Sequence, residues 1–145
     1  MRIVKLFEEF IKEQIVKKIS PDNQRAENLS LESERKYYLL QKTIETMGID
    51  DNNANDYIEY CYNIVLFLIR AKMLKQGYTS SGQGAHEAEV AFTRNIDFKE
   101  SEVQFLEQLR YFRNGVLYYG KRFDKEYAEK VIEFTKKNYL RLKSL

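Results

Sequence analysis

Residues 102–121, EVQFLEQLRYFRNGVLYYGK, contain the clearest helical pattern in the chain. Four of the apolar side chains recur at i, i+4, i+7 and i+11, which places them on one face of an α-helix: Phe105, Leu109, Phe112 and Val116. On a helical projection Arg113 lies only about 40° from Leu109, within this apolar face. A guanidinium stays charged and carries several N–H donors, so we expect Arg113 to have an anionic or carbonyl partner.

The composition is that of one globular, helical domain. The chain has 145 residues, of which 43% are hydrophobic and 32% charged, enough to bury one core without a metal or disulfide. It contains one proline and six glycines, and apolar residues recur at helical spacing almost throughout. We therefore expect a single domain over residues 1–145, an all-α, up-and-down bundle of about five to six helices. A net charge of +2 excludes an overall electrostatic footprint for DNA.

Apolar spacing predicts further helices at residues 2–19, 31–47, 56–76, 85–94 and 124–142. Gly48 is the expected stop of the second helix, and Asp124 is the expected N-cap of the last. The helix at 56–76 is apolar on nearly its whole circumference, which requires burial by the bundle or by a second subunit, and we expect a homodimer. The segment 77–84, rich in glycine and hydroxyl groups, is expected to be a mobile connector.

The other reactive side chains do not indicate a metal or cofactor site, and we expect neither. Cys61, the single cysteine, excludes an internal disulfide and a cysteine-based zinc site, and its apolar neighbours predict a buried thiol. His86 is the only histidine, and Glu87 and Glu89 beside it are too few for a metal site, so we expect a capping or solvated side chain. The apolar run 64–69 is too short to span a bilayer, and no signal peptide is visible. We therefore expect a cytoplasmic protein with no membrane partner.

Arg113 allows two interpretations. In the first it pairs with a carboxylate at the edge of the core, such as Glu102 or Glu107, and has a structural role. In the second it clamps a phosphate group, because a guanidinium binds phosphate through parallel hydrogen bonds. Neighbouring polar side chains would complete that clamp: Asn114, Tyr118 and Tyr119.

Helical geometry constrains the second interpretation. Asn114 and Tyr118 are i, i+4 neighbours and share a face, whereas Arg113 points about 100° away from Asn114 on an ideal helix. A joint site therefore requires Arg113 to reach round the helix, a distorted last turn near Gly115 and Gly120, or a two-fold axis that brings two copies together.

These features resemble the HEPN domain, a nucleotide-binding family of higher eukaryotes and prokaryotes. The resemblance extends over residues 31–143. It is carried by an apolar central helix ending in Lys75-Gln76-Gly77-Tyr78, a loop leading to His86, and a later helix with Arg113-Asn114 followed by Tyr118-Tyr119-Gly120. The family implies a helical bundle, frequent homodimers with the site in a groove at the interface, and pairing with a small nucleotidyltransferase, as in toxin–antitoxin pairs.

Active members of that family are metal-independent endoribonucleases whose motif is an Arg, a polar residue and, a few positions later, a His. Arg113 and Asn114 match the first two positions, but tyrosines and a glycine stand where the His is expected: Tyr118, Tyr119 and Gly120. A phenol, with an ordinary pKa of about 10, cannot simply replace an imidazole as general base at neutral pH. The resemblance therefore implies binding rather than RNA cleavage.

We expect a HEPN-like protein that binds a nucleotide or an RNA phosphate through Arg113 and Asn114, with Tyr118 and Tyr119 lining the groove. Two alternatives stay open. One is a non-catalytic interaction module, such as the helical partner subunit of a nucleotidyltransferase. The other is a weak metal-independent endoribonuclease, in which Arg113 would stabilise the pentacoordinate phosphate and Tyr118 would donate a proton.

Overall fold

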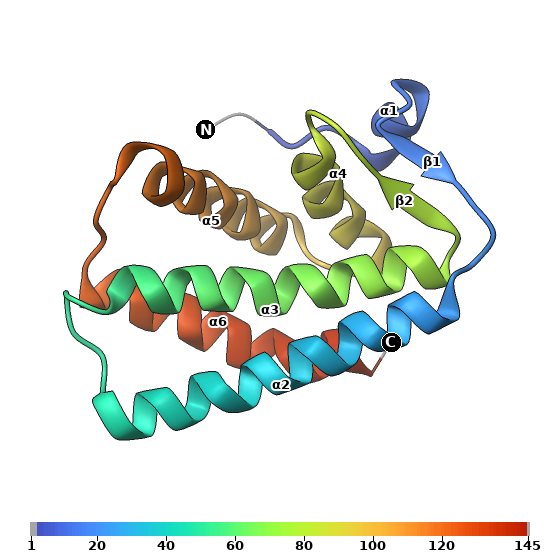
Figure 1. Cartoon of the computed structure of the whole chain (residues 1–145). Helices are drawn as coiled ribbons and strands as arrows, with labels where there is room; N and C mark the ends of the chain where they lie inside the picture. The colour runs from blue at the N-terminus through green and yellow to red at the C-terminus, as the bar shows by residue number, and fades with distance from the viewer. Residues whose placement is uncertain (1–2, 145) are drawn as a thin grey trace.

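Helices account for most of the chain, as the sequence predicts. The computed structural model describes residues 3–144, which form six α-helices, a short 3₁₀-helix and a two-stranded sheet (Figure 1). In chain order the elements are α1 (Phe7–Lys12), β1 (Val16–Lys18), α2 (Asn23–Met47), α3 (Ala54–Lys75), β2 (Tyr78–Ser80), α4 (Ala85–Phe92), η1 (Thr93–Ile96), α5 (Glu100–Tyr119) and α6 (Lys125–Lys143). The predicted all-α helical bundle is confirmed.

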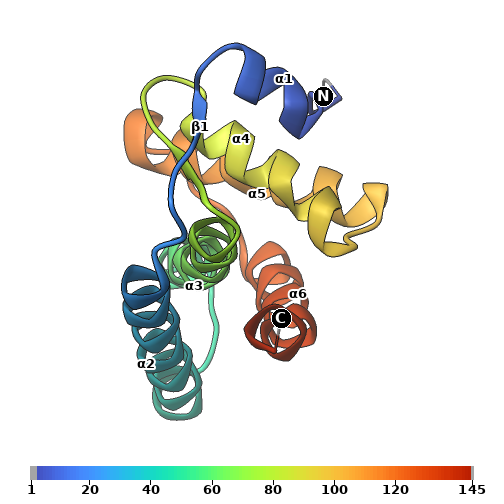
Figure 2. The same ribbon diagram turned by 90° about the vertical axis from the view of Figure 1, so that its right-hand side faces the viewer.

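The central helix of the bundle is α3. Viewed nearly along its axis, α2 and α6 lie below α3, while α4 and α5 lie above it (Figure 2). Its buried side chains cover most of its circumference and include Tyr57, Cys61, Ile64, Leu68 and Ile69. Because other parts of the same chain cover this apolar surface, the burial of α3 does not require a second subunit. Homodimerisation therefore stays a prediction without support from this helix.

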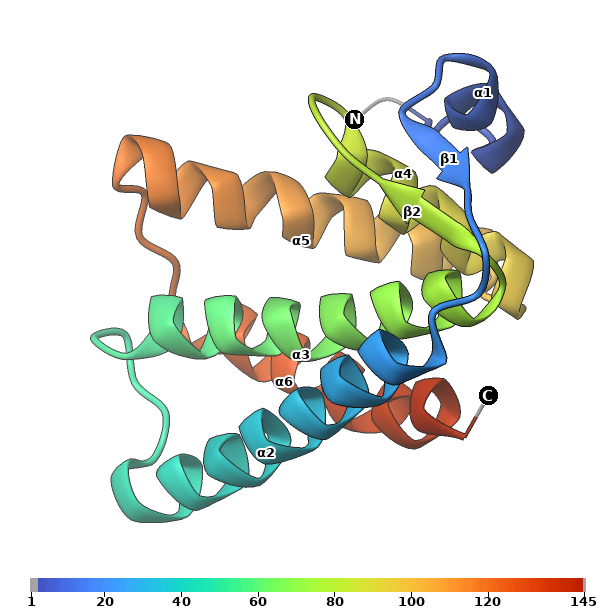
Figure 3. The same cartoon turned by 45° about the vertical axis from the view of Figure 1, so that its right-hand side comes forward.

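A loop connects α2 to α3 (Figure 3), and its own polar groups hold it. Gly48 ends α2, as predicted, with a φ of 69° that an L side chain rarely adopts. The carbonyl oxygen of Gly48 accepts hydrogen bonds from Asn53 Nδ2 at 3.1 Å and from Tyr57 Oη at 2.9 Å. These contacts fix the reversal of the chain at the start of α3.

Two aspartates cap the amino-terminal ends of α2 and α6. Asp22 Oδ1 accepts a hydrogen bond from the N–H of Arg25 at 3.0 Å, so α2 begins earlier than the predicted start at residue 31. The additional turns contribute Ala26, which is buried against the end of α3. Asp124 is the N-cap of α6, as predicted, and its Oδ1 accepts from the N–H of Tyr127 at 2.9 Å.

The predicted helix over residues 2–19 is wrong beyond α1, which ends at Lys12. Gln14 has a left-handed backbone with a φ of 62°, and the N–H of Ile15 donates to the Phe10 carbonyl oxygen at 3.0 Å. This combination is the Schellman pattern that ends a helix. Branched apolar residues fit a strand as well as a helix face, so periodicity alone missed the strand that follows. The first predicted residue lies outside the described residues.

The segment 77–84, predicted to be a mobile connector, instead contributes β2. This strand pairs with β1 in antiparallel register, with Thr79 opposite Lys17. Gly77 permits the close approach of the two backbones, because a Cβ at this position would lie 2.7 Å from the carbonyl oxygen of Ile19. The N–H of Ile19 donates to the Gly77 carbonyl oxygen at 2.8 Å. The sheet therefore ties the amino-terminal segment to the end of α3.

Helix α5 buries a different row of side chains from the predicted one. Leu109 is fully buried, but its predicted companions Phe105, Phe112 and Val116 are only half-buried. The row that is almost completely buried consists of Val103, Leu106 and Leu109. The half-buried aromatic rings instead contact α6; the ring of Phe105, for example, stacks on that of Phe134 with 4.4 Å between centroids. The helix is therefore covered on two sides, and one predicted stripe describes only part of its packing.

Cys61 is a buried free thiol, as predicted. Burial raises the pKa of this thiol to about 12. The thiolate is the reactive form of cysteine, so Cys61 is inert at neutral pH and belongs to the core.

Tyr127 provides a test of the packing between α5 and α6. Its hydroxyl is buried with no hydrogen-bond partner among residues 3–144, and burial raises its pKa to about 12. Tyr127→Phe removes an unsatisfied polar group while keeping the ring, so we expect the free energy of unfolding to stay unchanged or to rise by up to about 1 kcal/mol. Equilibrium unfolding in urea measures this change.

The matched control is Tyr57→Phe. Tyr57 Oη donates to the Gly48 carbonyl oxygen at 2.9 Å, so this substitution is expected to lower the free energy of unfolding by about 1 kcal/mol. If Tyr127→Phe destabilises the protein as much as Tyr57→Phe, the Tyr127 hydroxyl has a partner in solution and this description of the packing is wrong.

Candidate functional site

The last turn of α5 carries most of the residues predicted to form a site. Gly120 has a left-handed backbone with a φ of 64°, and the N–H groups of Gly120 and Lys121 both donate to the Gly115 carbonyl oxygen. This stop folds Lys121 back along the helix. A Cβ added at Gly115 would lie 3.2 Å from Lys121 Cδ, so the glycine leaves the space that the lysine side chain occupies.

Asn114 and Tyr119 line a pocket of about 260 Å³ at this end of α5. The other lining residues are Tyr111, Phe112, Gly115 and Lys121. Tyr118 is not part of the lining, and it is 74% exposed. The structure thus brings Asn114 together with Tyr119, and leaves Tyr118 on the adjacent solvent-facing surface.

Arg113 points away from that pocket and toward α3. Its guanidinium carbon lies 5.1 Å from the centre of the Tyr62 ring, a cation–π contact. Its Nε is buried and has no hydrogen-bond partner in the part of the chain that the structure describes. Arg113 and Asn114 therefore point in different directions from α5, as ideal helical geometry predicts. No distortion of the helix brings the two side chains into one pocket.

The carboxylates considered as structural partners of Arg113 bind other arginines. Glu102 Oε2 accepts from Arg141 Nη1 at 2.9 Å, and Glu107 pairs with Arg110 on its own helix. The interpretation of Arg113 as half of an ion pair with either carboxylate is therefore wrong.

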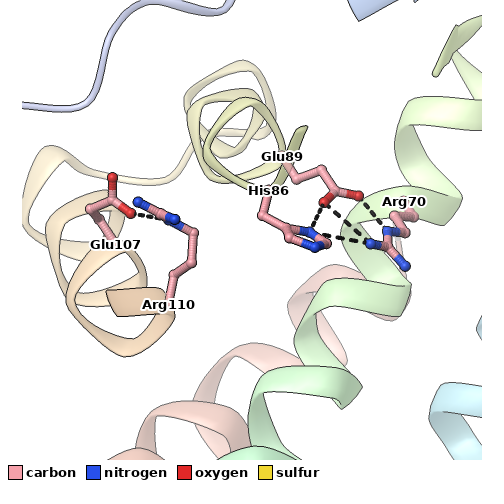
Figure 4. Close-up of polar contacts among 5 residues, drawn as sticks. All are labelled: Arg70, His86, Glu89, Glu107 and Arg110. Carbon is pink, nitrogen blue, oxygen red and sulfur yellow. Dashed lines mark hydrogen bonds and ion pairs between the residues drawn. The ribbon is translucent and has the colours of Figure 1, made fainter. Parts of the chain in front are cut away.

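A group of polar side chains that the sequence analysis missed lies between α3, α4 and α5 (Figure 4). One part joins Arg70 of α3 to His86 and Glu89 of α4, and the other is the pair of Glu107 and Arg110 on α5. We call these five residues the interhelical polar cluster. It gathers charged side chains from three helices next to the core.

Glu89 is the centre of the larger part of the cluster. It is only 2% exposed, and its carboxylate accepts from Arg70 Nε and from His86 Nδ1, the latter at 2.8 Å. A carboxylate oxygen accepts, so Nδ1 of His86 is the donor in this contact, and Arg70 Nη2 lies 3.3 Å from the same ring nitrogen. The His86 side chain is 44% exposed, in agreement with a solvated histidine, and its contact with Glu89 was not predicted.

Tyr62 connects the interhelical polar cluster with Arg113. Burial raises the pKa of its phenol, Glu89 raises it further, and the nearby guanidiniums of Arg113, Arg110 and Arg70 act in the opposite direction. The phenol therefore stays neutral among charged groups. Arg70 pairs with Glu89, and Arg110 pairs with a carboxylate of its own helix. Among the guanidiniums around Tyr62 in the described structure, Arg113 is the one without a carboxylate.

Part of this cluster has a local signal in the sequence. His86 with Glu89, and Glu107 with Arg110, are i, i+3 pairs that any helix brings together. The contact of Arg70 with Glu89 has no such signal, because it depends on how α4 lies against α3. A polar side chain within the apolar sequence AEVAF was the only indication that Glu89 is buried.

No protein-family model, curated protein or solved structure matches this chain. Within residues 3–144, no group of three or more His, Cys, Asp and Glu side chains is arranged to hold a metal ion. None of the helices in that range is both long enough and apolar enough to cross a membrane. The functional assignment therefore depends on the geometry of α5 and its neighbours.

Arg110 and Arg113 are expected to differ in their contributions to stability. Arg110→Ala leaves the Glu107 carboxylate, which is 2% exposed, without its partner, so we expect a loss of about 3–5 kcal/mol in the free energy of unfolding. Arg113→Ala removes a cation–π contact and leaves no carboxylate behind, so we expect a loss of about 0.5–2 kcal/mol. Equilibrium unfolding in urea, followed by circular dichroism, measures both.

Each substitution removes one positive charge from α5, so each is a control for the other. An Arg113→Ala variant as unstable as Arg110→Ala would mean that Arg113 neutralises a buried carboxylate in solution, and it would make Arg113 structural.

Proposed function

We propose that this protein binds a phosphate group of a nucleotide or of RNA through Arg113. One observation carries the proposal: Arg113 is a half-buried guanidinium that no carboxylate among the described residues neutralises. A partly desolvated cation is unfavourable without an anionic partner, and its donors suit a phosphate. The stacking of the guanidinium on Tyr62 holds it in one orientation, which lowers the entropy lost when it binds an anion.

The other partly buried arginines support this interpretation by contrast. Each of them has a carboxylate partner within the described structure: Arg70 with Glu89, Arg94 with Glu100, Arg110 with Glu107, and Arg141 with Glu102. The other partly buried guanidiniums of the described structure are therefore neutralised by carboxylates. Arg113 is not, and it lies on α5, the helix that was predicted to carry the site.

Aromatic side chains near the end of α5 favour a nucleic acid over a simple anion. Tyr111, Tyr118 and Tyr119 are each more than half exposed, and Asn114 lies beside them. Exposed aromatic rings bind single-stranded nucleic acids by stacking on the bases, which contributes about 1–3 kcal/mol per base. Because Arg113 and the tyrosines lie on neighbouring faces of α5, a ligand of more than one nucleotide fits them best.

The absence of a histidine from the α5 motif leads us to propose binding without cleavage. Tyr118 and Tyr119 are exposed phenols, which are poor general bases at neutral pH. On the strength of the resemblance to HEPN domains, we also propose a cytoplasmic homodimer and a small nucleotidyltransferase as partner, in a pair of the toxin–antitoxin type.

A non-catalytic interaction module is the second candidate function. It is favoured by the same surface, where Tyr111, Leu117, Tyr118 and Tyr119 expose apolar area at one end of α5. Exposed apolar surface of this kind marks protein interfaces as well as nucleic-acid sites. The two functions differ in their requirement for the charge of Arg113. A phosphate ligand requires this charge, whereas a helical partner protein bound to the apolar surface does not.

The binding of fluorescein-labelled single-stranded RNA, followed by fluorescence anisotropy at several salt concentrations, tests the proposal. Arg113→Ala is expected to weaken binding at least about tenfold and to reduce the slope of log K against log salt concentration by about one, because one phosphate contact is lost. The control is Arg35→Ala on α2, which removes the same charge from an exposed pair with Glu32 and should leave binding unchanged.

Unchanged binding by Arg113→Ala would place the RNA site elsewhere, and no binding by the wild-type protein at low salt would favour the interaction module. The same RNA is also expected to stay intact after incubation with chelator. Cleavage that is lost in both Arg113→Ala and Tyr118→Phe would instead support the metal-independent endoribonuclease.

A further inference from the structure

A separate pocket of about 270 Å³ lies where the start of α2, the end of α3, β2 and the start of α4 meet. Its polar lining consists of Arg25, Arg70, Tyr78, Thr79, Ser80 and Glu89. Leu29 and Met73 are among its apolar lining residues. The pocket is distinct from the one beside Asn114, and the two share no lining residue.

The positive charge in this pocket exceeds the negative charge. Arg25 is exposed, and its guanidinium has no ion pair or hydrogen bond to any residue between 3 and 144. Arg70 pairs with Glu89, which leaves Arg25 as the uncompensated charge of the lining. An anionic group is therefore the favoured occupant of the polar side.

Part of that polar side, Arg70 with Thr79 and Ser80, is held in place before any ligand binds. The buried carboxylate of Glu89 accepts from Arg70 Nε on α3 and from His86 Nδ1 on α4, so it holds Arg70 in place at the pocket. Thr79 and Ser80 lie in β2, whose pairing with β1 fixes their positions. Because Arg70 and the strand residues are already held in place, they lose little entropy when a ligand binds.

The start of α4 adds to the same field. Ala85, the first residue of α4, lines the pocket, and the N-cap residue Gly84 has no side chain to accept hydrogen bonds from the first-turn N–H groups. The amino-terminal end of a helix carries partial positive charge and favours anions such as phosphate. This field adds to the positive potential of the two guanidiniums.

The apolar lining specifies the rest of the ligand. The ring of Tyr78 makes an edge contact with that of Phe7, 5.2 Å between centroids, and lies tilted to that of Phe92 at 6.5 Å. With Leu29 and Met73 it offers a surface for a flat ring. A volume of about 270 Å³ is at the lower end for ligand pockets, so the ring must be small.

We infer that the pocket between α2, α3, β2 and α4 binds a small organic phosphate with a flat ring, of the size of a pyrimidine nucleoside monophosphate. The phosphate lies against Arg25, Arg70 and the start of α4, and the ring lies against Tyr78 and the apolar residues. This site does not depend on Arg113, so it goes beyond the proposed function of α5.

Isothermal titration calorimetry with uridine 5′-monophosphate tests this inference, with uridine and inorganic phosphate as separate probes. We expect the monophosphate to bind, and both uridine and inorganic phosphate to bind at least tenfold more weakly. Arg25→Ala is expected to weaken monophosphate binding at least tenfold. Arg25 is exposed and makes no side-chain contact that the fold requires, so this variant should fold normally. Arg35→Ala, which removes the same charge from the same helix, should bind like the wild type.

A further variant tests the polar side of this pocket. Thr79→Val, which keeps the shape of the side chain but removes its hydroxyl, should bind the monophosphate more weakly. No heat with the monophosphate at millimolar concentration, or equal binding by wild type and Arg25→Ala, would overturn the inference. If inorganic phosphate binds as tightly as the monophosphate, the ring makes no contribution to binding, and the inference that the pocket binds a flat ring is wrong. If Arg113→Ala is the only variant that loses monophosphate binding, the nucleotide binds at α5 and the inference is wrong.

Discussion

The burial of α3 is the constraint on which the rest of the structure depends. This helix presents apolar side chains around most of its circumference, so it can be stable in water only when other elements cover it on every side. The chain meets this requirement with α2 and α6 on one side and with α4 and α5 on the other (Figure 2). The small sheet of β1 and β2 completes the arrangement at the end of α3 and positions the start of α4.

Surrounding one helix with several others brings charged side chains into contact with a low-dielectric interior. Removing a charged group from water is unfavourable unless it has a partner of opposite charge. The buried carboxylates of Glu89 and Glu107 each pair with a guanidinium. Arg113 is the informative exception, because it is partly buried yet rests on the ring of Tyr62 rather than on a carboxylate. Its environment therefore differs in kind from that of a structural arginine.

The two candidate sites follow from the same architecture at different positions along α3. Tyr62, near the middle of α3, orients Arg113 of α5, whereas Arg70, two turns later, faces the pocket between α2 and α4. Glu89 influences both regions, since it binds Arg70 directly and raises the pKa of the Tyr62 phenol. One buried carboxylate therefore contributes to the electrostatic environment of Arg70 and of Tyr62.

The helical class, the main helices, the stop at Gly48, the cap at Asp124 and the buried thiol could be predicted from the sequence, because they depend on residues close together in the chain. The position of Arg113 on the apolar side of its helix was predictable for the same reason. Three features required the folded structure: the carboxylates available to Arg113, the pairing of residues 16–18 with 78–80, and the contact of Glu89 with both His86 and Arg70. Those contacts depend on how elements far apart in the sequence lie against one another. Their placement is set by the packing of the whole core, which spacing along one helix does not encode.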